Sequence, residues 1–216
     1  LMQQLMAMAV AEGLQESFFL HVAPNLGRDS SGSERLKPST PGDVGSTDIQ
    51  FMLRGAIKEA GLLVLINRHI EARTGTAPLG EDFNVRTAPQ DLESLLALCK
   101  QRISPEQMPQ LVGIGDTVTS TENSSGDGWL RGGSDRGFLT LLQELGRCFQ
   151  RPNRVVIVDS SGGEIDRPSL ADDSLTGISD PDDPLQFDVC FPGGPDQYVA
   201  WFVAFARARS EAGATT

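Results

Sequence analysis

The sequence contains few of the residues from which disulfide frameworks, zinc sites and membrane spans are built. Its three cysteines, Cys99, Cys148 and Cys190, show no Cys-x-x-Cys spacing, and it has only two histidines. The odd number and wide spacing of the cysteines favour reduced thiols, and two histidines argue against a histidine-rich zinc site. No apolar run approaches the roughly 20 residues that cross a bilayer, and the N-terminal residues lack the basic start of a secretion signal. We therefore expect a cytoplasmic protein that binds no membrane.

Basic residues are also scarce. Eighteen lysines and arginines against 29 aspartates and glutamates give a formal net charge of −11. Because binding to nucleic-acid phosphates needs clustered Lys and Arg, this composition argues against a nucleic-acid partner. Lysine occurs only as Lys37, Lys58 and Lys100. The phosphate-binding motif Gly-x-x-x-x-Gly-Lys-Ser/Thr and the nucleophile motif Gly-x-Ser-x-Gly are both absent.

The hydrophobic pattern is that of an α/β protein. Apolar spacing predicts helices over residues 1–14, 47–73, 91–102, 137–150 and 195–209, and strands over residues 18–22, 83–85, 111–114, 155–158 and 187–191. Strands that alternate with helices of this length are typical of a parallel sheet with crossover helices. Such crossovers are right-handed, so the loops that follow the strands gather at one edge. We therefore expect Asp116, Asp159 and Gly193-Gly194 to converge.

Two aspartates mark that edge. Asp116 ends the apolar stretch Leu111-Val-Gly-Ile-Gly, and Asp135 lies between this strand and the next helix, in Gly132-Gly-Ser-Asp. Two adjacent carboxylates raise each other's pKa unless a cation neutralises them, and Mg²⁺ prefers oxygen ligands. Their convergence therefore favours a magnesium site. Ordinary turn chemistry at Asp116 and an ordinary helix start at Ser134-Asp135 remain alternatives.

Two further segments have both a functional and a plain interpretation. Lys58 lies among small residues that would let a ligand approach, although a solvated helix lysine is the simpler interpretation. The run Asp159-Ser-Ser-Gly-Gly163 would bind an anion or a sugar hydroxyl at the tip of its strand, or would form an ordinary turn. The polar stretch of residues 23–46 is too long for a simple connection, which indicates either a functional loop or a disordered one.

Five segments in this order resemble the cyanobacterial glucosylglycerol-phosphate phosphatases, salt-tolerance enzymes of the haloacid-dehalogenase type. They are Lys58-Glu-Ala-Gly-Leu-Leu-Val-Leu, Gly113-Ile-Gly-Asp-Thr-Val-Thr-Ser, Gly132-Gly-Ser-Asp-Arg, Val158-Asp-Ser-Ser-Gly-Gly and Phe191-Pro-Gly-Gly. The resemblance implies a Rossmann-like, haloacid-dehalogenase-type parallel sheet core with a cap or inserted region. We expect the cap or flanking region, with part of the core, in residues 1–85, and the C-terminal portion of the phosphatase core in residues 86–216.

The resemblance also implies an activity. It is the Mg²⁺-dependent hydrolysis of a sugar-phosphate monoester, glucosylglycerol 3-phosphate, to phosphate and the osmolyte glucosylglycerol. In this interpretation Asp116 and Asp135 hold Mg²⁺, Asp116 and Lys58 are catalytic, and Lys58 contacts the phosphate. The loop residues Arg28, Arg35 and Asp43 are expected to bind the sugar.

The sequence departs from the family pattern at the nucleophile. The family's reaction begins at an Asp-x-Asp after an early strand, whereas Asp180-Pro-Asp182 is the chain's only such motif and lies in a polar loop. We expect the nucleophile in a segment upstream of Leu1, and we expect this chain alone to be inactive, because covalent phosphoryl transfer needs a positioned nucleophile. Two alternatives stay open: a non-catalytic module that binds a sugar phosphate or a protein, and a glycosyltransferase-like domain.

Overall fold

The computed structural model describes residues 2–15, 17–23, 38–41, 48–53, 57–122, 128–162, 167–171 and 174–213. The chain divides into two compact units, one of Leu1–Gln107 with Glu164–Asp166 and one of Met108–Gly163 with Arg167–Thr216. The division into cap and core at residues 85 and 86 stays a prediction, because compactness alone does not identify a cap. Among the described helices, none has the length and apolar character needed to span a membrane.

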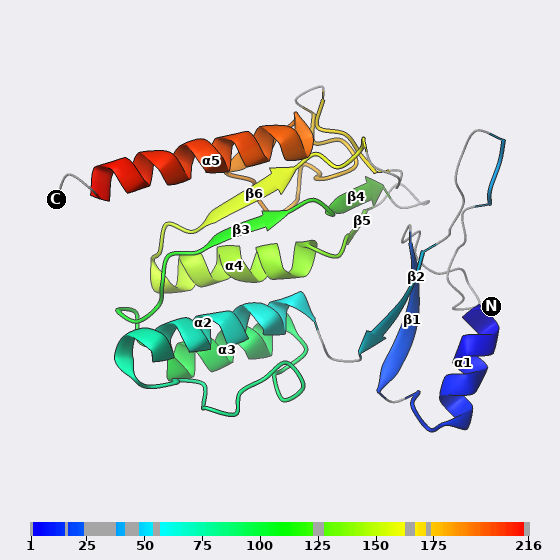
Figure 1. Ribbon diagram of the computed structural model, residues 1–216, viewed down its shortest axis with the longest axis horizontal. Coiled ribbons are helices and arrows are strands. Elements are labelled where there is room, and N and C mark those ends of the chain that lie inside the picture. Colours follow the sequence, from blue (N-terminus) through cyan, green and yellow to red (C-terminus); the bar gives the residue numbers. More distant parts are fainter. Residues whose placement is uncertain are drawn as a thin grey trace. The chain divides into compact units, whose positions relative to one another are not determined.

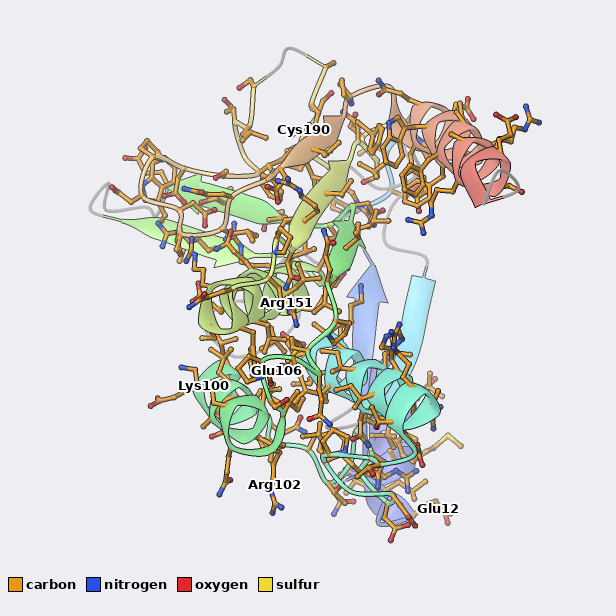
Figure 2. All side chains as sticks on the ribbon, turned by 90° about the vertical axis from the view of Figure 1, so that its left-hand side faces the viewer. Glu12, Lys100, Arg102, Glu106, Arg151 and Cys190 are labelled. Carbon is orange, nitrogen blue, oxygen red and sulfur yellow. The ribbon has the colours of Figure 1, made fainter. Side chains whose placement is uncertain are left out.

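In the described part of the first unit there are three helices and a two-stranded antiparallel sheet. Its elements are α1 (Met2–Ala11), β1 (Phe18–Ala23), β2 (Asp48–Leu53), α2 (Lys58–Thr74) and α3 (Leu92–Arg102). Strands β1 and β2 pair antiparallel, with Phe18 opposite Leu53. Helix α3 begins where the Asp91 carboxylate accepts a hydrogen bond from the Ser94 backbone N–H, at 2.8 Å. Figure 2 shows Lys100 and Arg102 extending outward from its last turn, where basic residues suit the helix dipole.

Two predicted elements of this unit are wrong. The helix expected from residue 47 begins only at Lys58, and residues 48–53 form β2 instead. Ile49, Phe51 and Leu53 alternate along the chain, so pairing with β1 decided in favour of a strand. The strand expected at residues 83–85 is a series of turns, closed by backbone hydrogen bonds such as that from Phe83 N–H to the Gly80 carbonyl.

The second unit is built on a parallel sheet. Its elements are β3 (Val112–Gly115), β4 (Thr119–Glu122), β5 (Trp129–Gly132), α4 (Arg136–Phe149), β6 (Arg154–Val158), β7 (Val189–Phe191) and α5 (Gly194–Gly213). Strands β3, β6 and β7 lie side by side in that order and all run parallel. Helix α4 packs on one face of this sheet and α5 on the other (Figure 1). The predicted α/β class with a parallel sheet is confirmed, and the three-layer arrangement is compatible with a Rossmann-like fold.

The two faces of the sheet are packed differently. On the α4 side, a Cβ at Gly113 would lie 2.7 Å from Leu142 Cδ1, and one at Gly115 would lie 2.9 Å from Leu139 Cδ1. Glycine is therefore needed at both positions for this close approach of helix and strand. On the other face Val156, Val158 and Phe191 form a buried cluster, and Tyr198 of α5 packs against it.

The hydrophobic pattern of the sequence did not predict the hairpin formed by β4 and β5. These strands pair antiparallel, with Thr119 opposite Gly132, and project from the end of β3. Two ion pairs fasten the neighbouring loop to this region, Arg131 to Asp180 at 2.7 Å and Arg136 to Asp183 at 2.8 Å. Both carboxylates are fully buried. These pairs therefore hold the loop of Asp180 and Asp183 against β5 and the start of α4.

Candidate functional site

The loops that follow β3, β6 and β7 meet at the C-terminal edge of the parallel sheet. The Ser160 hydroxyl, after β6, donates a hydrogen bond of 3.0 Å to the backbone carbonyl of Asp116, after β3. The Asp159 N–H donates to the Phe191 carbonyl at the end of β7, at 3.0 Å. Gly194 has a φ of +67°, and a Cβ there would lie 3.1 Å from the Asp159 carbonyl oxygen. The predicted convergence of Asp116, Asp159 and Gly193-Gly194 is confirmed.

Asp135 fixes the loop that carries Asp116. Its side chain is buried, and Oδ2 accepts hydrogen bonds from the backbone N–H groups of Asp116, at 2.8 Å, and Thr117, at 3.0 Å. Its own backbone N–H donates to the Thr117 carbonyl at 3.0 Å. Asp135 occupies the N-cap position of α4 but makes no side-chain capping bond, because its carboxylate turns toward β3 instead.

Two glycines allow this contact between Asp116 and Asp135. Gly133 has a φ of +97°, and a Cβ there would lie only 2.2 Å from the Thr117 carbonyl oxygen. A Cβ at Gly115 would lie 2.8 Å from the Cβ of Asp135. The hairpin between the two aspartates therefore folds back on itself, and the chain returns to the tip of β3. The structure brings Asp116 and Asp135 together, although 18 residues separate them in the sequence.

The Asp116 carboxylate is half-exposed and held at both oxygens. Oδ1 accepts a hydrogen bond from the Thr117 hydroxyl at 2.8 Å, and Oδ2 pairs with Arg167 Nη1 at 2.6 Å. Burial raises the pKa of Asp116, but the bonds from Thr117 and Arg167 and the charge of Arg167 outweigh it and hold the pKa below its usual value. Asp116 is therefore an ionised carboxylate at neutral pH.

Arg167 is the site residue that sequence reasoning missed. Its Nη1 lies 2.6 Å from Asp116 Oδ2 and 2.7 Å from the Ser160 hydroxyl, so it joins the loops after β3 and β6. It lies in a polar loop without periodicity or motif. One feature of the sequence could have indicated it. Lysine is scarce, so positive charge near a phosphate has to come mainly from arginine.

Asp159 is a second buried carboxylate at this edge. Oδ1 accepts from the Ser161 N–H and hydroxyl, at 2.8 and 2.6 Å, and Oδ2 accepts from the Ser169 hydroxyl and the Leu170 N–H. Burial raises the pKa of Asp159, but the hydrogen bonds from Ser161, Leu170 and Ser169 lower it below its ordinary value. The ionised carboxylate therefore organises the loop around it.

The structure does not test the remaining predicted residues. Lys58 begins α2 in the first unit, so its contact with a phosphate stays a prediction. Arg28, Arg35 and Asp43 lie outside the described residues. Asp180, in the only Asp-x-Asp, accepts hydrogen bonds from both Arg131 and Ser120, which agrees with a structural role for that loop.

The carboxylates at this edge are oxygen donors, the kind of ligand that Mg²⁺ prefers. Within the described ranges, no group of three or more His, Cys, Asp or Glu side chains could hold a metal ion. Mg²⁺ keeps several waters and binds through one or two carboxylates together with substrate phosphate. The half-exposed, ionised Asp116 and the buried Asp135 beside it are the two carboxylates at this edge that such an ion would use.

Comparison with known proteins identifies the family of the chain. A family model described as glucosylglycerol-phosphate phosphatase matches residues 1–206. The curated glucosylglycerol-phosphate phosphatase of Synechocystis sp. is 49% identical over 220 residues, which cover 97% of this chain and 52% of that protein. The chain thus spans about half the length of this curated relative. No solved structure matches the chain. With a family match over nearly its whole length, the chain belongs to the glucosylglycerol-phosphate phosphatase family.

Proposed function

We propose that this chain takes part in the Mg²⁺-dependent hydrolysis of a sugar-phosphate monoester, glucosylglycerol 3-phosphate, in the cytoplasm. The observation that supports this proposal is the ionised, half-exposed Asp116 at the tip of β3. The buried Asp135 carboxylate holds its loop by accepting hydrogen bonds from the backbone N–H groups of Asp116 and Thr117. Ligands of open α/β sheets collect at this edge. The family match supplies the substrate class.

In this proposal the residues of the chain position the metal ion and the phosphoryl group, and none of them attacks phosphorus. Asp116 and Asp135 would hold Mg²⁺, which when bound neutralises charge on the phosphoryl group. Arg167 adds positive charge at the same carboxylate, and Lys58 is proposed to contact the phosphate. Proteins promote phosphoryl transfer mainly by positioning the reacting groups and by stabilising their negative charge with cations.

The nucleophile of the proposed aspartyl-phosphate step would come from outside the 216 residues. No apolar strand in this sequence ends in Asp-x-Asp, and Asp180 is engaged with Arg131. We also propose that the core is of the haloacid-dehalogenase type and that the cap lies within residues 1–85. Both assignments follow from the family resemblance.

Magnesium binding tests the proposal without requiring turnover. We expect Mg²⁺ to raise the melting temperature of the chain, because ligands that bind only the folded state stabilise it. Asp116→Asn should abolish this shift, whereas Asp188→Asn, at a partly exposed carboxylate on the opposite end of the sheet, should leave it unchanged. An unchanged Mg²⁺ response in Asp116→Asn would refute the site.

Two further ligands separate the alternatives. Affinity for a nucleotide sugar, measured by calorimetry, would favour the glycosyltransferase-like domain. Binding of a sugar phosphate that does not depend on Mg²⁺ or on Asp116 would favour the non-catalytic module. The phosphatase proposal requires that Asp116 and Mg²⁺ act together.

A further inference from the structure

A cavity adjoins the Asp116 site at the C-terminal ends of β6 and β7. It has a volume of about 480 Å³, within the range of small-molecule pockets. Its lining combines hydroxyl groups with small apolar side chains: Asp159, Ser160, Ser161, Gly162, Ser169, Ala171, Pro192, Gly193, Gly194 and Pro195. Every one of these residues belongs to the second unit.

Each of the three serine hydroxyls in this cavity already donates its hydrogen to an acceptor of the protein. Ser161 and Ser169 donate to the Asp159 carboxylate, at 2.6 and 3.0 Å, and Ser160 donates to the Asp116 carbonyl at 3.0 Å. A hydroxyl has one hydrogen and two lone pairs. Only lone pairs are therefore left for a ligand, and these oxygens can accept hydrogen bonds but not donate them.

The backbone groups and the charge of the cavity also favour a ligand that donates hydrogen bonds. The N–H groups of Ser161, Ala171 and Gly193 donate to side chains of the chain itself. Pro192 and Pro195 have no N–H to offer. The carboxylate of Asp159 adds negative charge to the lining. A phosphate monoester dianion, which only accepts hydrogen bonds, receives none from these groups.

We propose that this cavity binds the uncharged, hydroxyl-rich part of the substrate, a sugar or polyol, whose phosphate lies at Asp116. Ligand hydroxyls donate to the serine oxygens, and the C–H faces of a sugar pack against Pro192, Pro195 and Ala171. Ser160 connects the two positions, because it lines the cavity and bonds to Asp116. This inference rests on the proposed function and adds where specificity for the neutral moiety resides.

Nuclear magnetic resonance of the ¹⁵N-labelled chain tests the location. Titration with glucosylglycerol, which carries no phosphate, should shift the backbone amides of Ser161, Gly162 and Gly193. Inorganic phosphate should not shift them. Shifts confined to other residues, or no shifts at glucosylglycerol concentrations on the order of 50 mM, would overturn the inference. Movement of the same amides by phosphate would overturn it as well.

A cavity-filling substitution tests the pocket without disturbing the fold. A Cβ at Gly162 meets no atom within 4 Å, and its φ is not in the left-handed region. Gly162→Leu should weaken glucosylglycerol binding by about tenfold or more through lost space. Gly61→Leu, on α2 and equally open at its Cβ, serves as the matched control and should bind normally. Equal affinities in both variants would refute the cavity.

Removal of one acceptor tests the hydrogen-bond argument. Ser161→Ala deletes a lining hydroxyl but keeps the backbone N–H that bonds to Asp159. It should weaken glucosylglycerol binding severalfold, while Ser174→Ala, at a hydroxyl paired with Thr176 outside the cavity, should not. Because no arm of this design uses Mg²⁺, a failure here leaves the magnesium test of Asp116 intact, and a failed magnesium test leaves sugar binding measurable.

Discussion

Asp135 is the residue on which the geometry of the candidate site most depends. It gives up its usual capping role in α4 to hold two backbone N–H groups of the loop after β3. Hydrogen bonds to a charged group contribute about 1.5–3 kcal/mol each, more than neutral ones. The orientation of Asp116 therefore follows from a buried neighbour that lies beyond an entire hairpin.

Replacement of Asp135 by asparagine should show this dependence. Asp135→Asn keeps the shape but removes the charge from the acceptor, so we expect a loss of about 1–3 kcal/mol in the free energy of unfolding. Urea denaturation measures it. Asp188→Asn, at a carboxylate that also accepts a strand N–H but is one-third exposed, should lose less. Equal losses in the two variants would argue against a special role for Asp135.

Gly133 permits the return of the chain to Thr117. Gly133→Ala places a Cβ 2.2 Å from a backbone oxygen in a left-handed conformation, so we expect a destabilisation of about 2–4 kcal/mol. Gly80 has a similar φ of +104°, but no atom lies within 4 Å of the position that a Cβ would take there. Gly80→Ala should therefore cost only about 1 kcal/mol, the strain of the left-handed backbone. Similar denaturation midpoints for the two variants would contradict the clash.

At the level of elements, the hairpin and the loop that faces it act together. Arg136, the first residue of α4, donates to both oxygens of Asp183 and to the carbonyls of Thr119 and Ile178. One guanidinium thus joins the helix, β4 and the loop after Leu170. Because Arg136 bonds to several segments at once, it holds β4 and this loop in place beside the start of α4.

The ion pair between Arg136 and Asp183 predicts a defined pH dependence. Burial raises the pKa of Asp183, but the bonds from Arg136, Leu185 and Ser179 outweigh it, so the folded-state pKa lies below the ordinary carboxyl value of 3.8. A depressed carboxylate pKa stabilises the fold above the unfolded pKa, and this stability is lost as pH falls below 3.8 through the folded pKa.

Asp183→Asn measures this contribution. We expect it to destabilise the fold by on the order of 3 kcal/mol near neutral pH, because it leaves Arg136 without its charged partner. The difference from the parent chain should stay constant above about pH 5 and shrink below about pH 4, as Asp183 itself becomes protonated. A difference that grows on acidification would contradict the assignment.

For the molecule as a whole, the chain covers about half of its curated relative. Its second unit carries both the candidate magnesium site and the proposed sugar cavity. The sequence has no apolar strand that ends in Asp-x-Asp. The net charge of −11 makes a local cationic group such as Arg167 important for any phosphorylated ligand.

We predict that the isolated chain releases no phosphate from glucosylglycerol 3-phosphate in the presence of Mg²⁺. A longer protein in which these residues follow a strand ending in Asp-x-Asp should release it, and Asp116→Asn in that protein should reduce turnover at least about 100-fold. Phosphate release is followed colorimetrically. Turnover by the isolated chain that requires Asp116 would overturn the expectation of an external nucleophile.

Local sequence patterns were sufficient to predict the central elements of the second unit. The apolar runs at residues 111–114 and 155–158, the helical spacing after residue 136, and right-handed crossovers together predicted the parallel sheet and the convergence of Asp116, Asp159 and Gly194. The family resemblance was visible in short motifs of the same segments.

Contacts between residues far apart in the sequence could not be predicted from local patterns, because they form only in the folded chain. Residues 48–53 alternate and also fit a helical pattern, and pairing with β1 selected the strand. The pairing of β4 with β5, the bond between Asp135 and the Asp116 loop, and the approach of Arg167 from 51 residues away carry no local signal. Each depends on which segments the folded sheet brings within hydrogen-bond distance, and that is a property of the packed chain rather than of any short stretch of it.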